Sequence, residues 1–269
     1  MACKQGALCR EVIGVARRTE TAAEAIAMDA VHRATTDLAD GVEGADVIVL
    51  ATPVRIIVRQ IWELATMPLS PCLLLDLGST KGDVVAAMDE LPAQVQPVGA
   101  HPMCGKETAG LAAAEPALFQ GAPWVLVPLP RTSPPALALA RDLVVAVGAR
   151  PLVLDADRHD RLVAAISHLP YALAVTLVLA AAEVGEEDKL VWQLAASGFR
   201  DTSRLAASNV TMALDILLTN QEAVVAALRR TSRQLNRLAD LIAAGDEDEL
   251  RALLAGAREK RAASERMSE

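Results

Sequence analysis

Histidine is the side chain in this sequence best suited to move a proton, and its occurrences stand mainly in dense polar segments. His101 opens the segment HPMCGKETAG, directly after an apolar run typical of a strand. A histidine held at the carboxyl end of a strand by proline and glycine-rich backbone is a natural general base. His168 stands in SHLP, inside an apolar helical stretch where an unpaired polar group is costly, so we expect it to have a partner or a ligand. His159, in DRHD at the start of the same stretch, is interpreted as part of a polar helix cap.

Two further polar segments could bind or orient a substrate. DLGSTK (76–81) follows a buried strand directly, although taken alone it could be an ordinary turn and helix cap. GFRDTSR (198–204) holds two arginines between helices, which suits the recognition of a carboxylate through paired hydrogen bonds. The alternative for this second segment is a charged loop in which Asp201 and Arg204 pair.

Strands and helices alternate through the first half of the chain. Strands are expected at 11–15, 45–51, 72–77, 96–100, 124–127 and 151–154, and helices at 21–28, 56–64 and 136–147. The strands are mostly continuous apolar runs, as expected where both faces of a sheet are covered, and their alternation with helices predicts a mostly parallel sheet. His101 and the segment 76–81 both follow such strands, at the sheet edge where α/β proteins bind ligands.

The strand signals stop near residue 155, and the rest of the chain is expected to be helical. Helices are predicted at 157–184, 188–195, 209–243 with a break near Asn220, and 247–265. We therefore expect an α/β domain over 1–155 and a helical substrate and dimerisation domain over 156–269. In the tail, a mainly apolar seam steps by four and three residues along the predicted helix. It either lines an amphipathic helix on its own domain or forms a dimer interface, and its residues are Val224, Leu228, Thr231, Leu235, Leu238 and Ile242.

Composition excludes several classes of protein. A net charge of −8 argues against a nucleic-acid partner, and the four cysteines show no zinc-binding spacing, so we expect no metal and free thiols in the cytoplasm. The apolar stretch 162–182 is about long enough to span a bilayer. It contains His168 and Pro170, which fit a buried functional helix better than a membrane span, so no membrane partner is expected.

Four of these segments in order resemble the prephenate/arogenate dehydrogenase family. They are GSTK (78–81), HPMCGKETAG (101–110), SHLP (167–170) and GFRDTSR (198–204), within a similarity that runs from about Glu11 to Asn220. The resemblance implies an enzyme of tyrosine biosynthesis that oxidises a cyclohexadienol carrying a ring carboxylate. Hydride passes to NAD or NADP, the carboxylate leaves as CO2, and the product is 4-hydroxyphenylpyruvate from prephenate or tyrosine from arogenate.

The resemblance also implies roles for individual residues. His101 would take the proton of the ring hydroxyl, Ser79 would orient that hydroxyl beside the nicotinamide, and Arg204 would bind a substrate carboxylate. His168 would sit in the substrate pocket. Further substrate contacts are expected at Gly105, Glu107 and Tyr171, and Thr52 and Pro53 match the family's adenosine-side loop. Tyr171 stands where many prephenate-using members have a second histidine, which leans the expectation slightly toward arogenate and leaves the substrate open.

The family's glycine-rich phosphate loop is absent from this sequence. The chain opens MACKQGALCREVIGVARR, in which EVIGV resembles the second strand of a nucleotide-binding sheet and no G-x-G-x-x-G precedes it. We therefore expect an incomplete Rossmann-type sheet that lacks its first strand. Arg17 and Arg18 follow EVIGV, and either could meet the 2′-phosphate of NADP or simply be solvated.

Two alternatives to an active dehydrogenase of this family remain open. The first is a truncated, catalytically idle chain that dimerises through its helical half. The second is a β-hydroxyacid dehydrogenase, a family that depends on a catalytic lysine in its helical domain. Lys189, the lysine available for that role, lies outside the polar segments described above.

Overall fold

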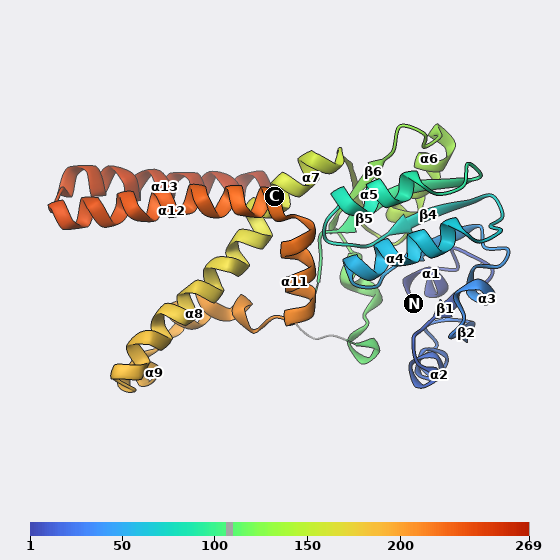
Figure 1. Ribbon diagram of the computed structural model, residues 1–269, viewed down its shortest axis with the longest axis horizontal. Helices are drawn as coiled ribbons and strands as arrows, with labels where there is room; N and C mark the ends of the chain where they lie inside the picture. Colours follow the sequence, from blue (N-terminus) through green and yellow to red (C-terminus); the bar gives the residue numbers. More distant parts are fainter. Residues whose placement is uncertain (106–109, 269) are drawn as a thin grey trace. The chain divides into compact units, whose positions relative to one another are not determined.

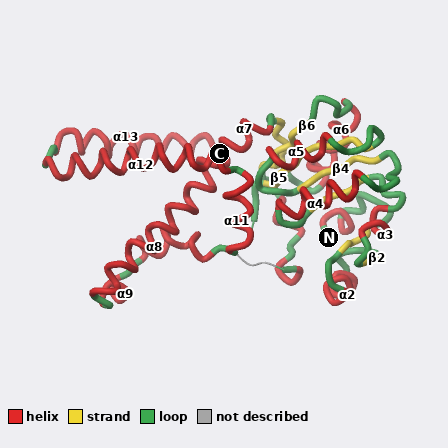
Figure 2. Tube along the Cα trace, in the orientation of Figure 1, coloured by secondary structure: helices red, strands yellow, loops and turns green. Residues whose placement is uncertain are grey.

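The computed structural model describes residues 1–105 and 110–268 (Figure 1). By its internal contacts the chain divides into two units, residues 1–221 and 222–269. The first unit carries the strands and the polar segments, and the second is helical (Figure 2).

A five-stranded sheet with the order β3-β4-β5-β6-β7 forms the centre of the first unit. The strands are β3 (Val47–Leu50), β4 (Cys72–Asp76), β5 (Val95–Pro102), β6 (Pro123–Pro128) and β7 (Arg150–Val153). All neighbouring pairs are parallel except β5 and β6, so the prediction of a mostly parallel sheet is confirmed.

Both faces of this sheet are covered, as the continuous apolar runs predict. Leu74 of β4 packs into one core with α4 (Val54–Ala65) and α5 (Gly82–Asp89). Its neighbours Leu73 and Leu75 point to the other face and pack with α6 (Pro134–Ala146), because successive side chains of a strand alternate. Ser133 caps α6 through its hydroxyl, and Pro134 occupies the first turn, where a backbone N–H is not needed. The short helices η1 (Leu111–Ala113) and η2 (Pro116–Phe119) precede β6.

The N-terminal strands form a separate sheet. β1 (Ile13–Val15) pairs in parallel with β2 (Arg33–Thr35), and α1 (Ala2–Gln5), α2 (Thr19–Ala27) and α3 (Leu38–Val42) accompany them. Within residues 1–105 and 110–268, β1 has β2 as its partner and β3 has β4 as its partner, with no ladder between β1 and β3. Val15 and Val49, on these two strands, are 41% and 45% exposed.

A single long helix was predicted after the last strand, and the structure interrupts it. α7 (Ala156–Val163) passes through a π-helical turn, η3 (Ala164–His168), into α8 (Leu169–Glu187). Pro170 lies in the first turn of α8 and has no N–H to bond the preceding turn, which favours the wider winding just before it. The first unit continues with α9 (Leu190–Leu194), α10 (Ser197–Ser203), η4 (Arg204–Ala207) and α11 (Val210–Thr219). α11 ends beside Asn220, so the predicted break is confirmed.

The stretch Ala156–Glu187 is long and apolar enough to cross a membrane, judged by length and composition alone. Among the described residues it is the one helix that passes this test. The bent pair of α11 and the next helix, α12 (Gln221–Ala244), would be a second candidate if the two were taken as one span. This is weak evidence for insertion, because a core helix of a soluble protein passes the same test. The stretch does leave large apolar side chains uncovered: Ile166 is 68% exposed, Leu179 57% and Val184 54%.

The second unit is a helical hairpin. α12 (Gln221–Ala244) and α13 (Glu247–Ser268) run side by side, joined at Gly245, whose φ of 64° reverses the chain (Figures 1 and 2). Arg237 and Glu249 bridge the two helices at 3.4 Å. Two residues of the predicted apolar seam, Leu235 and Ile242, remain 55% and 61% exposed.

Candidate active site

The segment 76–81 is built around a buried ion pair. Asp76 ends β4 and binds the ammonium group of Lys81, and both side chains are fully buried. The carboxylate of Asp76 also accepts the backbone N–H of Gly78 at 2.7 Å and that of Ala100 at 2.8 Å. This pair therefore fixes the turn that carries Ser79 and ties it to β5 immediately before His101. The segment is thus more than the ordinary turn and helix cap that was the alternative.

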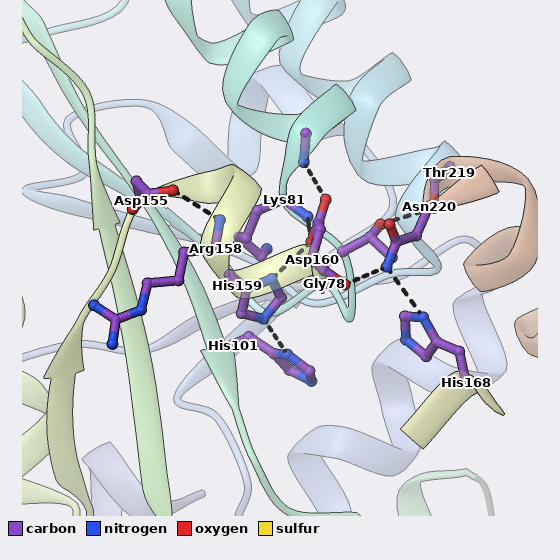
Figure 3. Close-up of polar contacts among 12 residues, drawn as sticks. Gly78, Lys81, His101, Asp155, Arg158, His159, Asp160, His168, Thr219 and Asn220 are labelled. Carbon is purple, nitrogen blue, oxygen red and sulfur yellow. Dashed lines mark hydrogen bonds and ion pairs between the residues drawn. The ribbon is translucent and has the colours of Figure 1, made fainter. Parts of the chain in front are cut away.

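The cap of α5 comes from a distant helix. The helix has no side-chain cap of its own at Lys81. Instead Asp160, on α7, accepts the backbone N–H of Lys81 at 2.8 Å through Oδ1 and that of Gly82 at 2.9 Å through Oδ2 (Figure 3). A carboxylate at a helix N-terminus is favoured both by these hydrogen bonds and by the helix dipole.

Asp160 also begins a chain of side chains that ends at His101. Its Oδ1 lies 2.7 Å from Nδ1 of His159, and Nε2 of His159 lies 2.9 Å from Nδ1 of His101 (Figure 3). The interpretation of His159 as a polar cap is wrong, because Asp155 caps α7 by accepting the N–H of Arg158, and His159 is 1% exposed. His159 instead connects Asp160 to His101.

The backbone of Asp160 connects to His168 through Asn220. Its carbonyl oxygen accepts a hydrogen bond of 2.8 Å from Nδ2 of Asn220, and the same Nδ2 lies 3.2 Å from Nδ1 of His168. The expectation that buried His168 has a partner is confirmed, and the partner is Asn220. Thr80 and Thr219, joined through their hydroxyls at 2.7 Å, make a parallel connection between the turn after β4 and the end of α11.

Burial keeps both His101 and His168 neutral. Desolvation, assisted by nearby His159 and Lys81, lowers the pKa of His101 from 6.5 to about 2. Desolvation also lowers the pKa of His168 to about 4, against the opposing attraction of Asp160. Both imidazoles are therefore uncharged near neutral pH, the state in which an imidazole can accept a proton.

These two lowered pKa values predict acid sensitivity. In the unfolded chain both histidines titrate near pH 6.5, so below that pH the unfolded state binds more protons than the folded state. Each histidine should therefore remove about 1.4 kcal/mol of unfolding free energy per pH unit as the pH falls from about 6.5 to about 4. Urea denaturation across that range measures the slope. His101→Asn and His168→Asn should each reduce it, and a slope that neither substitution changes would contradict the burial described here.

The other predicted site residues are spread over several elements. Half-buried Ser79 lies in the turn held by Asp76, and half-buried Tyr171 lies on the first turn of α8. Arg204 is exposed at the start of η4, which packs on α8. Gly105 is exposed, and Glu107 lies outside the described residues.

The predicted cofactor residues lie at the carboxyl ends of parallel strands. Arg17 and Arg18 follow β1, Arg18 reaching the hydroxyl of Thr21 at 3.5 Å. Thr52 and Pro53 lie between β3 and α4, and Thr52 donates to Gln60 at 2.7 Å. All four are exposed. Guanidinium and hydroxyl groups at this sheet edge fit the ribose and phosphate chemistry of a dinucleotide. The described part of the chain has no glycine-rich turn from a strand into a helix to hold its pyrophosphate.

Sequence reasoning missed the residues that hold the site together. Asp160 and His159 stand adjacent on α7, and Asn220 lies directly after α11. A signal for Asp160 was available: Asp160, Ala164 and His168 step by four, so they share a helix face, and the last of them was already a candidate. No comparable pattern marks Asn220.

Comparison with known proteins agrees with the resemblance found in the sequence. The family model described as the prephenate dehydrogenase nucleotide-binding domain matches residues 2–153, and that of the prephenate dehydrogenase dimerization domain matches residues 155–256. Prephenate dehydrogenase of Lactococcus lactis subsp. cremoris is 34% identical over 206 residues, which cover 76% of this chain and 56% of the relative. The chain thus spans little more than half of that relative.

Solved structures of prephenate and arogenate dehydrogenases have the same fold as this chain. The structure of prephenate dehydrogenase from A. aeolicus in complex with hydroxyphenyl propionate and NAD+ superposes with a TM-score of 0.89 at 28% identity, over 97% of this chain and 91% of that one. Arogenate dehydrogenase from Synechocystis superposes with a TM-score of 0.84 at 32% identity, over 98% and 94%. With its two family domains matched in order along nearly the whole sequence, the chain belongs to the prephenate dehydrogenase family.

Proposed function

We propose that this protein catalyses the oxidative decarboxylation of prephenate or arogenate with NAD(P)+, a reaction of tyrosine biosynthesis. The observation that carries the proposal is the setting of His101. It is a neutral imidazole at the carboxyl end of a sheet strand, and it is hydrogen-bonded to His159, which in turn contacts Asp160. The family membership and the similarity to prephenate and arogenate dehydrogenases support it.

In the proposed mechanism the chain's own residues position the substrate and take one proton. His101 accepts the proton of the ring hydroxyl as the carbon that bears it becomes a carbonyl-like centre. Ser79, in the turn held by Asp76, hydrogen-bonds the same hydroxyl. A bound NAD(P)+ would supply the hydride acceptor for that carbon. Loss of the ring carboxylate as CO2 makes the ring aromatic, and the proton held by His101 then returns to the ring oxygen.

Substrate binding is assigned to residues of the helical half and the loop after β5. Arg204 binds a substrate carboxylate, for which a planar guanidinium is well suited. His168, Tyr171 and Gly105 are assigned to the substrate as well. Glu107, also assigned to it, lies outside the described residues.

The cofactor is assigned to the carboxyl edge of the sheets. Thr52 and Pro53 would lie on the adenosine side and Ser79 beside the nicotinamide. Arg17 and Arg18 would lie at the ribose, where a guanidinium that meets a 2′-phosphate favours NADP over NAD.

We further assign residues 1–155 to the nucleotide-binding domain and residues 156–269 to a helical domain that forms a cytoplasmic homodimer. The described match to a dimerization domain supports the second assignment. So do the exposed apolar side chains of α8, since an exposed apolar face of this kind is typical of a protein interface.

The test is a direct assay of the purified chain. Prephenate and arogenate are each incubated with NAD+ and with NADP+, and the reduced nicotinamide and the released CO2 are both measured. The proposal expects equal amounts of the two products with at least one substrate. Cofactor binding by calorimetry without turnover of either substrate would refute the proposed substrates, and no cofactor binding at all would favour the catalytically idle alternative.

A further inference from the structure

We propose that Asp160 is a positioning residue that sets opposite tautomers of the two pocket histidines, so that His101 presents a lone pair to the substrate and His168 presents an N–H. The proposal deepens the function proposed above and rests on it for its kinetic consequences. Its structural part, the placement of two protons, rests on hydrogen-bond geometry among uncharged imidazole rings.

The first branch runs through the side chain of Asp160. Its carboxylate already accepts two backbone N–H groups, those of Lys81 and Gly82, so it is an acceptor. Nδ1 of His159, 2.7 Å from Oδ1, must therefore carry a proton, and in the uncharged form of this ring Nε2 is then an acceptor. Nδ1 of His101 lies 2.9 Å from that Nε2 and must donate to it. The lone pair of His101 is then on Nε2.

The second branch runs through the backbone of the same residue. The carbonyl oxygen of Asp160 can only accept, so the amide group of Asn220 must present its nitrogen there, as it does at 2.8 Å. The second hydrogen of that nitrogen points to Nδ1 of His168 at 3.2 Å, which must accept it. A neutral His168 therefore carries its proton on Nε2.

Burial of these side chains excludes the alternative tautomers. Asp160 is 8% exposed, His159 1%, His168 2% and Asn220 6%, so solvent is not available to satisfy an alternative arrangement. Both branches begin at Asp160. In His101 the ring nitrogen Nδ1 donates and Nε2 accepts, whereas in His168 Nδ1 accepts and Nε2 donates. The result is a proton acceptor at His101 and a hydrogen-bond donor at His168, which suit a substrate that must lose a hydroxyl proton while its anionic oxygens are held.

The tautomers can be read directly by nitrogen NMR. The chain has only four histidines, so labelling with ¹⁵N-histidine gives few signals, and protonated and unprotonated ring nitrogens differ widely in chemical shift. His32 is an internal reference, because its Nδ1 accepts the N–H of Val12 at 2.9 Å and its proton must be on Nε2. We expect His101 and His159 protonated at Nδ1, and His168 protonated at Nε2. A proton on Nε2 of His101 would overturn the proposal.

Kinetics test whether the arrangement matters. In Asp160→Asn the side-chain amide can turn its nitrogen toward His159. The tautomers of His159 and of His101 would then both be reversed. We expect kcat to fall about a hundredfold while the dissociation constant of NAD(P)+ stays within about twofold. Asp157→Asn, at an exposed position on the same helix, is the matched control and should leave kcat unchanged.

A second pair of variants separates positioning from a merely structural role and covers the case in which Asp160→Asn fails to fold. His159→Gln keeps an acceptor for Nδ1 of His101, whereas His159→Leu removes it. Glutamine should retain at least tenfold more kcat than leucine, and equal losses would overturn the proposal. If the unsubstituted chain turns over neither substrate, the proposed function fails while the NMR pattern still decides the tautomers.

Discussion

Replacement of His101 by asparagine should lower kcat about a thousandfold, within the range that general-base catalysis contributes. Asparagine keeps a polar group at the carboxyl end of β5 and can still reach His159, but its amide cannot accept a proton from the ring hydroxyl. The dissociation constant of NAD(P)+ should change little, because the predicted cofactor residues lie after β1, β3 and β4. The measurement is the single-turnover rate of nicotinamide reduction together with calorimetric cofactor binding.

The matched control for this experiment is His32→Asn, because His32 lies beside β2 and hydrogen-bonds the backbone of Val12 rather than the catalytic network. It should keep the full rate. A variant at His101 that retains more than about a hundredth of the rate would mean that another group takes the proton, since removal of a general base costs at least about a hundredfold.

Replacement of Asp76 by leucine should be the most damaging substitution for stability, with a loss of about 3–5 kcal/mol in unfolding free energy. Lys81 would keep its burial without a counterion, and the N–H groups of Gly78 and Ala100 would lose their acceptor. Burial already lowers the pKa of Lys81, and the attraction of Asp76 opposes that shift, so the unpaired ammonium is the main cost. Urea denaturation near neutral pH measures the loss.

Two further variants identify the origin of the stability lost in Asp76→Leu. Lys81→Met should cost less than Asp76→Leu, because the remaining carboxylate still accepts two backbone hydrogen bonds. The double variant should be more stable than Asp76→Leu alone, since a buried ion pair replaced as a whole by apolar side chains loses far less than one broken in half. A double variant as unstable as Asp76→Leu would show that the lost hydrogen bonds, and not the isolated ammonium, dominate.

The sequence predicts the elements whose apolar pattern is strong and misses those held by distant contacts. β4 and α4 are marked by their own runs of apolar residues. β2, with the sequence Arg-Ala-Thr, has no such run and is a strand because it pairs with β1. α5 begins at a glycine without a side-chain cap of its own, and its first N–H groups bind Asp160, 78 residues further along the chain. No local pattern contains that information.

The same distinction holds in the site. His101 and His168 are recognisable because a histidine after a strand, or inside an apolar helix, needs a reason to be there. The path that joins them, from His159 through Asp160 to Asn220, combines α7 with the residue after α11. Such a path depends on how α7 lies against the end of α11, which is a property of the fold and not of either helix.

The π-helical turn between α7 and α8 leaves the candidate site and the apolar face of α8 on one continuous helical stretch. Each residue of an α-helix advances the side chains after it by about 100°, so one residue removed from residues 161–163 of α7 would rotate His168 away from Asn220 by roughly that angle. The same deletion would rotate Leu179 and Val184, because α8 follows the turn without a break. A π-helical turn is wound more widely than an α-helical one, so a change of one residue inside Ala164–His168 would be absorbed there with less rotation of α8.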